Sequence, residues 1–479
     1  MRQFKKQISG KKALIIILCL SFLVLLLPNM IRFWHGNNTL VGHESYYNAW
    51  HAENFEGSLV ETNNLVHGSR IGFNAYQILI SGISFFLGTV AASKIIPFIL
   101  GILSAILFYI VMIKLGFTHN KSFLSSLLFV ASPIYMYVFS VSSMYSLVIF
   151  LNLLGLYCFI MNGKFFYAAL ASYAIIPFLG LYNSLASIAV LITYAALKKK
   201  QNIKLIILTI IVLSAVYNGV MIFEFGLPQK IAAGDASFLQ KFVSEIGAGL
   251  GLSMFMLFLV VSGILVSWEK KKLFYPLYIF MILLALTTIY IGDFANIYLN
   301  LVFSAFAGIS IFRLIRRKWE FPVIRNLLLG IILVGIVFSG TFYSIQIANS
   351  EPYERMISPL KQLKQADQGI VLSHPKNAHI IRYYADKQPF TETSYNYLYY
   401  DYALGDYVRK DSAGRIFSSI YLADAVALLE NNQIEYIYVD ENMKKGLVWD
   451  ENEELLFLLS NRETFKKLHG TDNEVYKIK

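Results

Sequence analysis

Apolar runs about as long as a membrane is thick recur along the first 344 residues, with the charged residues concentrated between them. A membrane helix needs about 20 mostly apolar residues to cross about 30 Å of hydrocarbon. Charged residues make up only 15% of the chain, against roughly 25% in soluble domains. We therefore expect a polytopic α-helical membrane protein and exclude a soluble enzyme. The predicted spans cover eleven runs: 13–30, 95–113, 122–140, 142–161, 165–180, 181–197, 205–223, 246–268, 273–291, 294–312 and 322–344.

The segment 71–92 is the ambiguous part of this pattern, because it is apolar but carries Asn74, Gln77 and three glycines. Cytoplasmic loops of membrane proteins are enriched in Lys and Arg. If the N-terminus is cytoplasmic and 71–92 lies in the outer interface, 20 of the 25 basic residues before residue 351 are cytoplasmic. Counting 71–92 as a span would move these basic clusters outside. We therefore expect a multi-pass protein of the cell membrane with a cytoplasmic N-terminus and an extracytoplasmic C-terminus.

Charge divides the chain into two predicted domains, 1–344 in the membrane and 345–479 outside it. The residues before 351 have a net charge of +15 and the rest −4. The overall +11 is therefore a signature of topology, and we expect no nucleic-acid partner. A long external loop, 31–94, belongs to the first of these domains. The two cysteines lie in apolar runs, which excludes a disulfide framework or a Cys-based zinc site.

The C-terminal domain is predicted to be a small α/β domain, because short apolar strands alternate with helical patterns. Strands separated by helices favour a parallel sheet. The tyrosine-rich stretch 395–407 favours aromatic anchoring at an interface or domain packing, with sugar stacking as the alternative. The predicted helices are 353–365, 377–386, 419–431 and 453–468, and the predicted strands are 369–373, 434–440 and 475–479.

The first external loop concentrates the side chains suited to chemistry. It contains the sequence Gly42-His43-Glu44-Ser45-Tyr46-Tyr47-Asn48-Ala49-Trp50-His51. A carboxylate beside aromatic rings, just past the first membrane helix, is placed to meet a lipid-borne substrate. A partly buried carboxylate has its pKa raised toward the range of a general base. We therefore predict Glu44 as a base that takes a proton from an acceptor hydroxyl as this oxygen attacks the anomeric carbon of a sugar.

This loop resembles that of the GT-C fold membrane glycosyltransferases, including the polyprenyl- or dolichyl-phosphate-dependent protein mannosyltransferase and aminoarabinose transferase types. Their first loop carries a Gly-x-Asp-Ser-Tyr-Tyr-like motif, matched here by residues 42–47 with Glu44 in place of Asp. The segment 71–92 looks like their juxtamembrane helices. Ala91-Ala92-Ser93-Lys94 stands where a basic phrase opens their second span. The tail lacks a Trp-Trp-Asp motif, so it does not resemble an oligosaccharyltransferase.

The resemblance implies cell-envelope glycosylation, with one sugar transferred from a polyprenyl-phosphate-linked donor, with inversion. The acceptor is a saccharide, a lipid or a protein. Arg70 and Lys94 are the predicted ligands of the leaving phosphate, with contacts to ordinary membrane lipids as the alternative. Tyr46 and Tyr47 would line the sugar pocket, beside His43 and His51. Glu44, His43 and His51, with Asp235 and Glu245, are candidate ligands for Mg²⁺ or Mn²⁺. We expect that no metal is required, and the position of a metal site stays unknown.

Two other functions are compatible with such a chain. The first is a non-catalytic scaffold with the same fold, or an exporter of lipid-linked saccharides, which the change from Asp to Glu44 keeps open. The second is an ion-coupled transporter. Such transporters need ionisable residues inside the membrane, and here these residues occur only at the ends of the predicted spans. The transporter is therefore disfavoured.

Overall fold

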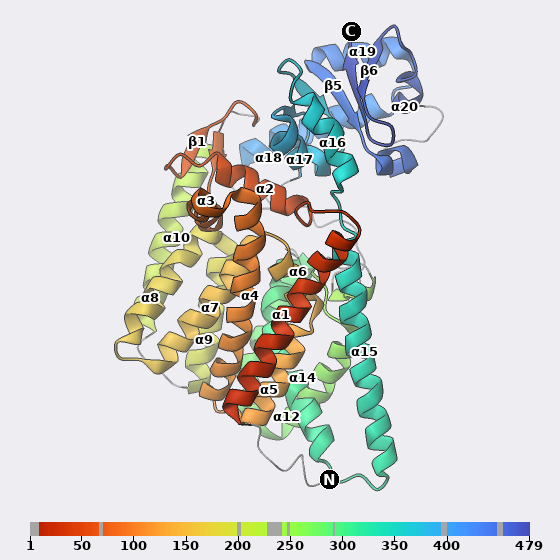
Figure 1. The fold of residues 1–479 in the computed structure, drawn as a ribbon. Helices are drawn as coiled ribbons and strands as arrows, with labels where there is room; N and C mark the ends of the chain where they lie inside the picture. Colours follow the sequence, from red (N-terminus) through yellow and green to blue (C-terminus); the bar gives the residue numbers. More distant parts are fainter. Residues whose placement is uncertain are drawn as a thin grey trace. The chain divides into compact units, whose positions relative to one another are not determined.

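The computed structural model describes residues 9–66, 70–198, 203–227, 242–246, 250–290, 293–393, 400–447 and 454–479 (Figure 1). The chain forms two compact units. The membrane unit comprises Met1–His35, Lys94–Gly219 and Ile231–Asn349. The second unit, called here the head, comprises Gly36–Ser93, Val220–Lys230 and Ser350–Lys479.

Apolar helices account for all eleven predicted runs. Within the described residues, seven helices are long and apolar enough to cross a membrane, and a bent pair of helices makes a further candidate. The chain is thus a polytopic helical membrane protein, and the number of eleven spans stays a prediction. The seven are α1 (Gly10–Trp34), α4 (Thr89–Lys114), α7 (Met144–Met161), α9 (Leu181–Lys198), α10 (Lys204–Phe225), α14 (Asn296–Arg316) and α15 (Pro322–Ala348). The remaining runs hold α5 (His119–Val130) and α6 (Pro133–Ser140), α8 with η2 (Phe165–Leu179), α12 (Met254–Ser267) and α13 (Lys271–Tyr290).

Local sequence explains where these helices break. α5 and α6 meet at an angle of 61°, because Ser132 caps α6 and Pro133 occupies its first turn. Proline lacks the N–H that a continuous helix would need there. The predicted break between 165–180 and 181–197 lies at Gly180, whose φ of 115° favours glycine.

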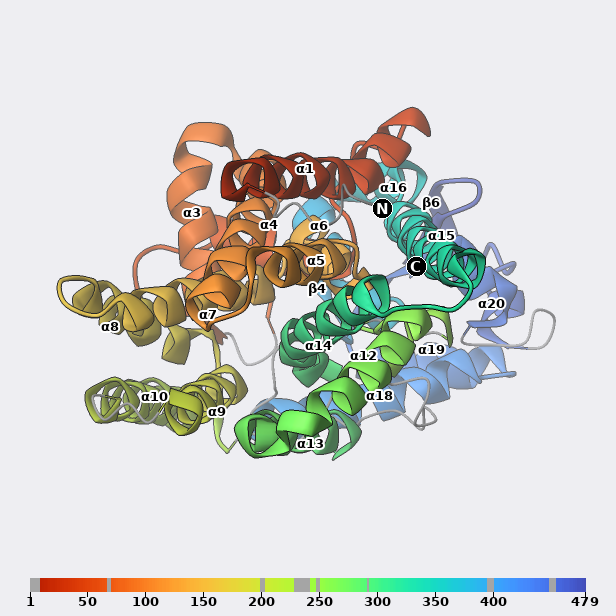
Figure 2. The same cartoon turned by 90° about the horizontal axis from the view of Figure 1, so that it is seen from below.

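Glycines allow the helices of the membrane unit to approach closely. α14 packs against both α5 and α12, and Figure 2 shows it lying between them. A Cβ atom on Gly308 would overlap with Ser125 of α5, and one on Gly263 of α12 would overlap with the carbonyl group of Phe306. The packing of α14 therefore depends on two positions without side chains.

The ambiguous segment 71–92 contains a short separate helix, α3 (Ala75–Leu87). The Asn74 side chain accepts hydrogen bonds from the N–H groups of Tyr76 and Gln77, and the Gln77 side chain accepts one from the Asn74 N–H. This capping box explains the two polar residues that made the segment ambiguous. α3 ends at Gly88, with a φ of 76°. Its 13 residues extend about 20 Å, which is less than the thickness of the hydrocarbon layer.

A five-stranded sheet in the order β4-β3-β5-β7-β6 forms the centre of the head. β3 (Ile370–Leu372) is parallel to β4 (Gln388–Pro389) and β5 (Ile434–Val439). β7 (Glu474–Ile478) is antiparallel to β5 and to β6 (Phe465–His469). One face packs against α18 (Tyr400–Phe417), α19 (Leu422–Asn431) and α20 (Leu455–Leu458). The other face packs against α16 (Glu354–Leu363), α17 (Ala378–Ile380) and η7 (Ile381–Ala385).

The prediction of an α/β domain is confirmed in the tail, but two details are wrong. The sheet is mixed, because β6 and β7 form a hairpin, and a hairpin makes its strands antiparallel. The predicted helix 453–468 is limited to α20 among the described residues. The Asn461 side chain accepts hydrogen bonds from the N–H groups of Glu463 and Thr464, a turn that ends α20 and starts β6. Residues 395–399 of the tyrosine-rich stretch lie outside the described residues, and α18 begins at Tyr400.

The first loop joins the tail in one unit, whereas the predicted division at 344/345 assigned it to the membrane domain. α2 (His43–Glu53) packs on α3, α17 and η7. Leu40, Tyr46 and Ala49 belong to the same buried cluster as Val371 and Tyr436 of the sheet. The first loop has too few apolar residues to form a core of its own, so it buries them against the core of the tail. The head is therefore built from two parts of the chain that are far apart in sequence.

Candidate active site

Glu44 lies in the first turn of α2, directly after Gly42 and His43. Gly42 has a φ of 73°, which lets the chain turn sharply into the helix. The Glu44 residue is buried, with 6% of its surface exposed. The positive end of the helix dipole favours a carboxylate at this position. The backbone carbonyl of Glu44 accepts a hydrogen bond of 3.2 Å from the Asn48 side chain one turn later.

Tyr46 is fully buried in the core of the head. Its hydroxyl accepts a hydrogen bond of 3.0 Å from the N–H of Leu40 and lies 3.1 Å from the hydroxyl of Tyr384. Its ring lies 5.4 Å from the ring of Tyr383. These contacts favour a packing role, and the predicted sugar contact of Tyr46 stays a prediction.

Tyr47 is partly exposed and lies in a group of rings. Its ring centre is 4.1 Å from that of His51 and 5.0 Å from that of His379. His51 Nδ1 donates a hydrogen bond of 2.8 Å to the carbonyl of Tyr47. Burial lowers the pKa of His51 to about 3, so this imidazole is neutral. Of the two predicted tyrosines, Tyr47 is therefore the one with surface left for a substrate.

A buried ion pair lies beside these rings, and no sequence pattern indicated it. Arg382 and Glu392 form the pair, with 2% and 4% of their side chains exposed. The guanidinium of Arg382 lies 5.3 Å from the centre of the Trp50 ring, and its Nε donates to the carbonyl of Leu65 at 3.0 Å. A charge from the tail thus holds the first loop at two points.

The predicted phosphate ligands lie in different units. Arg70 is at the start of β2 (Arg70–Gly72) in the head and pairs with Glu224 at the end of α10. Lys94 is in the first turns of α4 in the membrane unit, where it is close enough to Arg32 for their charges to interact. Arg32 is buried and donates a hydrogen bond of 3.0 Å to the carbonyl of Ala348.

The described residues do not fit a metal site. No group of three His, Cys, Asp or Glu side chains among them has the arrangement of metal ligands. Glu245 accepts hydrogen bonds from Ser339 at 2.6 Å and from the N–H of Met254 at 3.2 Å, at the start of α12. Asp235, the other predicted acid, lies outside the described residues.

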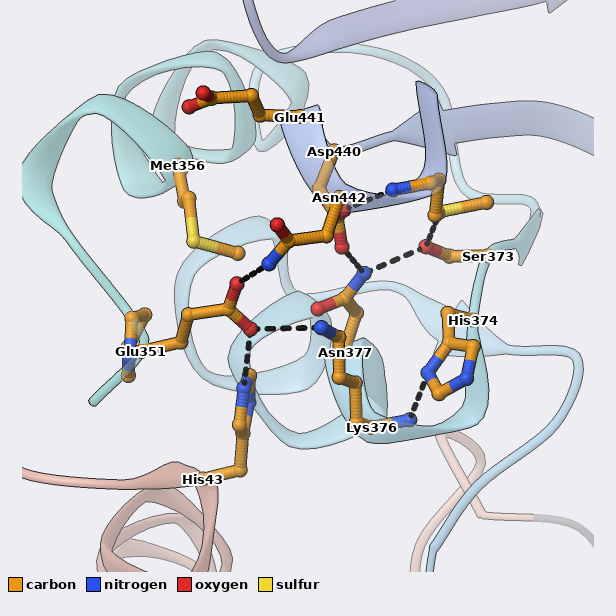
Figure 3. A network of polar contacts seen from close by, with 12 residues as sticks. His43, Glu351, Met356, Ser373, His374, Lys376, Asn377, Asp440, Glu441 and Asn442 are labelled. Carbon is orange, nitrogen blue, oxygen red and sulfur yellow. Dashed lines mark hydrogen bonds and ion pairs between the residues drawn. The ribbon is translucent and has the colours of Figure 1, made fainter. Parts of the chain in front are cut away.

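His43 belongs to a polar network that sequence patterns did not reveal (Figure 3). Its Nε2 lies 3.5 Å from Oε2 of Glu351, which also binds Lys376 Nζ at 2.8 Å. The other carboxylate oxygen of Glu351 accepts a hydrogen bond from Asn442. Three segments of the head meet at this carboxylate, and one of them, at His43, precedes Glu351 by 308 residues in the chain.

Comparison with solved structures shows the same architecture along nearly the whole chain. An oligosaccharyltransferase of Archaeoglobus fulgidus, crystallised with zinc and sulfate, aligns with 96% of this chain and 73% of its own, at a TM-score of 0.63 and 13% identity. ArnT of Cupriavidus metallidurans, bound to undecaprenyl phosphate, aligns with 98% of both chains, at 0.56 and 12%. The mycobacterial arabinofuranosyltransferase AftD aligns with 98% of this chain and 42% of its own, at 0.52 and 13%.

The chain has the GT-C fold. The expected fold is thereby confirmed. No model of a known protein family matches the sequence. No curated protein matches it either. At 11–13% identity to its GT-C neighbours, the likeness concerns the fold, so the expectation that the chain is not an oligosaccharyltransferase stays a prediction.

Proposed function

We propose that this GT-C protein transfers a sugar from a polyprenyl-phosphate-linked donor to an acceptor on the outer face of the cell membrane. The observation that carries the proposal is the alignment of the chain over 98% of its length with ArnT bound to undecaprenyl phosphate. A second GT-C neighbour, the archaeal oligosaccharyltransferase, has been solved with a peptide and dolichol-phosphate. Both neighbours bind a lipid with a single phosphate at the end of a long isoprenoid chain.

Glu44 is the proposed base. Its carboxylate takes the proton of the acceptor hydroxyl as this oxygen forms a bond to the anomeric carbon. The bond from this carbon to the donor phosphate breaks on the opposite side, so the configuration inverts and polyprenyl phosphate leaves with the electron pair. The position of Glu44 in the first turn of a helix that is packed on the core of the head supports this role, since a base must be held within hydrogen-bond reach of the proton.

Lys94 and Arg32 are the proposed ligands of the leaving phosphate. Two cations that lie close together, one of them buried, repel each other, and an anion between them relieves the repulsion. Arg32 is the last charged residue of α1 and Lys94 is the first charged residue of α4, so the two flank the first loop in the sequence. Arg70 is a weaker candidate, because Glu224 already neutralises it. Tyr47 and His51 would then face the sugar or the acceptor.

The test is a transfer assay with the purified full chain in detergent and a panel of undecaprenyl-phosphate sugars and surface saccharides. The Glu44→Gln variant keeps the shape of the side chain and removes the base, so we expect transfer to fall at least a hundredfold. Glu53→Gln, at the other end of α2, is the matched control. Its carboxylate accepts a hydrogen bond from Tyr383, and it should retain activity.

Normal transfer by Glu44→Gln would contradict the assigned base. The alternative function, a non-catalytic scaffold or an exporter of lipid-linked saccharides, predicts that the wild-type protein binds undecaprenyl phosphate without transferring a sugar from any donor in the panel.

A further inference from the structure

The carboxyl ends of β3 and β5 form the place where open α/β sheets usually bind a ligand. The chain runs from β3 to β4 on one side and later to β5 on the other, as the order β4-β3-β5 shows. Ligands of such sheets bind outside the carboxyl ends of the strands, where the strand order changes direction. In the head, the side chain of Glu351 occupies this position (Figure 3).

Glu351 is held there from both strands. Lys376, in the turn after β3, binds one carboxylate oxygen at 2.8 Å, and Asn442, after β5, binds the other. Burial alone would raise the pKa of Glu351, but hydrogen bonds from His43 and Lys376 and the charge of Lys376 lower it to about 2. The carboxylate is therefore charged at every pH at which the protein would work, and its position is fixed by the sheet.

The segment 37–43 lies along Glu351 and the next residue. The carbonyl oxygen of Pro352 accepts hydrogen bonds from Thr39 Oγ1 at 2.9 Å and from Asn37 Nδ2 at 3.4 Å. Glu351 contacts the ring of His43 through Nε2, and Nδ1 of the same ring is buried without a hydrogen-bond partner among the described residues. Among the described contacts, Glu351 thus makes the side-chain polar contact that holds this ring.

We infer that Glu351 is a positioning residue that fixes the start of α2 through His43, and thereby the carboxylate of the adjacent Glu44. The consequence for catalysis rests on the proposed function, whereas the consequence for the start of α2 does not. Glu351 comes three residues after the end of α15, and its carboxylate sets the geometry at the start of α2 in the first loop.

Hydrogen exchange of the purified full chain in detergent tests the structural part. In Glu351→Gln, we expect amides of residues 37–47 to exchange about tenfold faster, because a hydrogen bond to a charged group is lost. Glu441→Gln is the matched control. Its side chain lies at the same edge of the sheet and points away from the network (Figure 3), toward Arg355 and Lys445. Unchanged exchange of residues 37–47 in Glu351→Gln would overturn the inference.

A second variant covers the case that Glu351→Gln does not fold, since that change leaves Lys376 without its carboxylate. His43→Asn removes the ring and leaves the contacts of Glu351 with Lys376 and Asn442. It should produce the same faster exchange of residues 37–47. If it leaves their exchange at the wild-type level, the inference fails.

The transfer assay tests the catalytic part. We expect kcat of Glu351→Gln and of His43→Asn to fall about ten- to a hundredfold, as for a misplaced catalytic group, with the KM for the lipid donor unchanged. The double variant should lose no more than either single variant, because both act through one contact. Additive losses, or a change confined to KM, would overturn it. If the wild type transfers no sugar, the proposed function fails, and the exchange experiment still decides the role of Glu351.

Discussion

The side chains of α2 differ in what their polar atoms already contact. The hydroxyl of Tyr46 is engaged by Leu40 and Tyr384, while the partly exposed Tyr47 meets two imidazole rings. Periodicity along α2 does not separate these two tyrosines, because they are adjacent and equally aromatic. Their difference comes from Tyr384, which lies 338 residues later. The motif in the first loop was therefore predictable from the sequence. Which of its two tyrosines is buried and which is partly exposed was not.

Two buried imidazoles make the stability of the protein depend on pH. Burial lowers the pKa of both His51 and His379 to about 3. The unfolded chain binds these protons below about pH 6.5 and the folded chain does not. Stability therefore falls as the pH drops from 7 to 5, by roughly 2 kcal/mol for each ring. Glu351 does not contribute in this range, since its pKa is lowered from 4.5 and its stabilising charge is lost only below that value.

Thermal unfolding in detergent at pH 7, 6 and 5 checks this dependence. Variants His51→Gln and His379→Gln should each show a smaller drop of the midpoint between pH 7 and 5 than the wild type. Glu441→Gln serves as the reference variant. An equal drop in the wild type and in the two histidine variants would rule the explanation out.

At the scale of helices and strands, the hydrophobic pattern predicted most of the membrane unit. Apolar runs mark each helix, and Ser132 with Pro133 marks the bend. The errors lie in the tail, where elements are short. The predicted helix 453–468 covers both α20 and β6, which are separated by the turn at Asn461. The hydrogen bonds of the Asn461 side chain end the helix there, although the apolar pattern continues.

Gly308 provides the test of helix packing. In Gly308→Ala the new methyl group would overlap with Ser125 of α5, so we expect a loss of about 1–3 kcal/mol from overpacking. Gly330→Ala is the matched control, since Gly330 lies in α15 with open space around its Cβ position. That change should leave stability equal or raise it by up to about 1 kcal/mol. Unfolding midpoints in one detergent compare the two, and equal midpoints would show that α5 and α14 can separate without loss.

At the scale of the whole molecule, the head unites residues 36–93 with 350–479. Charge and hydropathy located both segments outside the predicted spans, but neither property tells which side chains meet. Arg382 and Glu392 show why. They are ordinary charged residues in the sequence, and only the fold encloses them beside Trp50.

Removing one partner of this ion pair should destabilise the head. Arg382→Met leaves the Glu392 carboxylate buried without its counter-charge, which costs about 3–5 kcal/mol. The double variant Arg382→Met with Glu392→Gln should recover much of this loss, since no buried charge remains. Limited proteolysis of the first loop and thermal unfolding measure both effects. A double variant as unstable as Arg382→Met would mean that packing on Trp50, and not charge, holds the loop.

The head is built from segments that are far apart in the chain, and this sets the order in which it can form during synthesis. The ribosome makes His43 308 residues before Glu351, so the loop that bears the proposed base emerges long before the residues that order it. Closing so long a loop is slow and entropically costly. The nascent first loop must therefore wait while the intervening helices are inserted. Maturation of the site would be among the last events in the biogenesis of this protein.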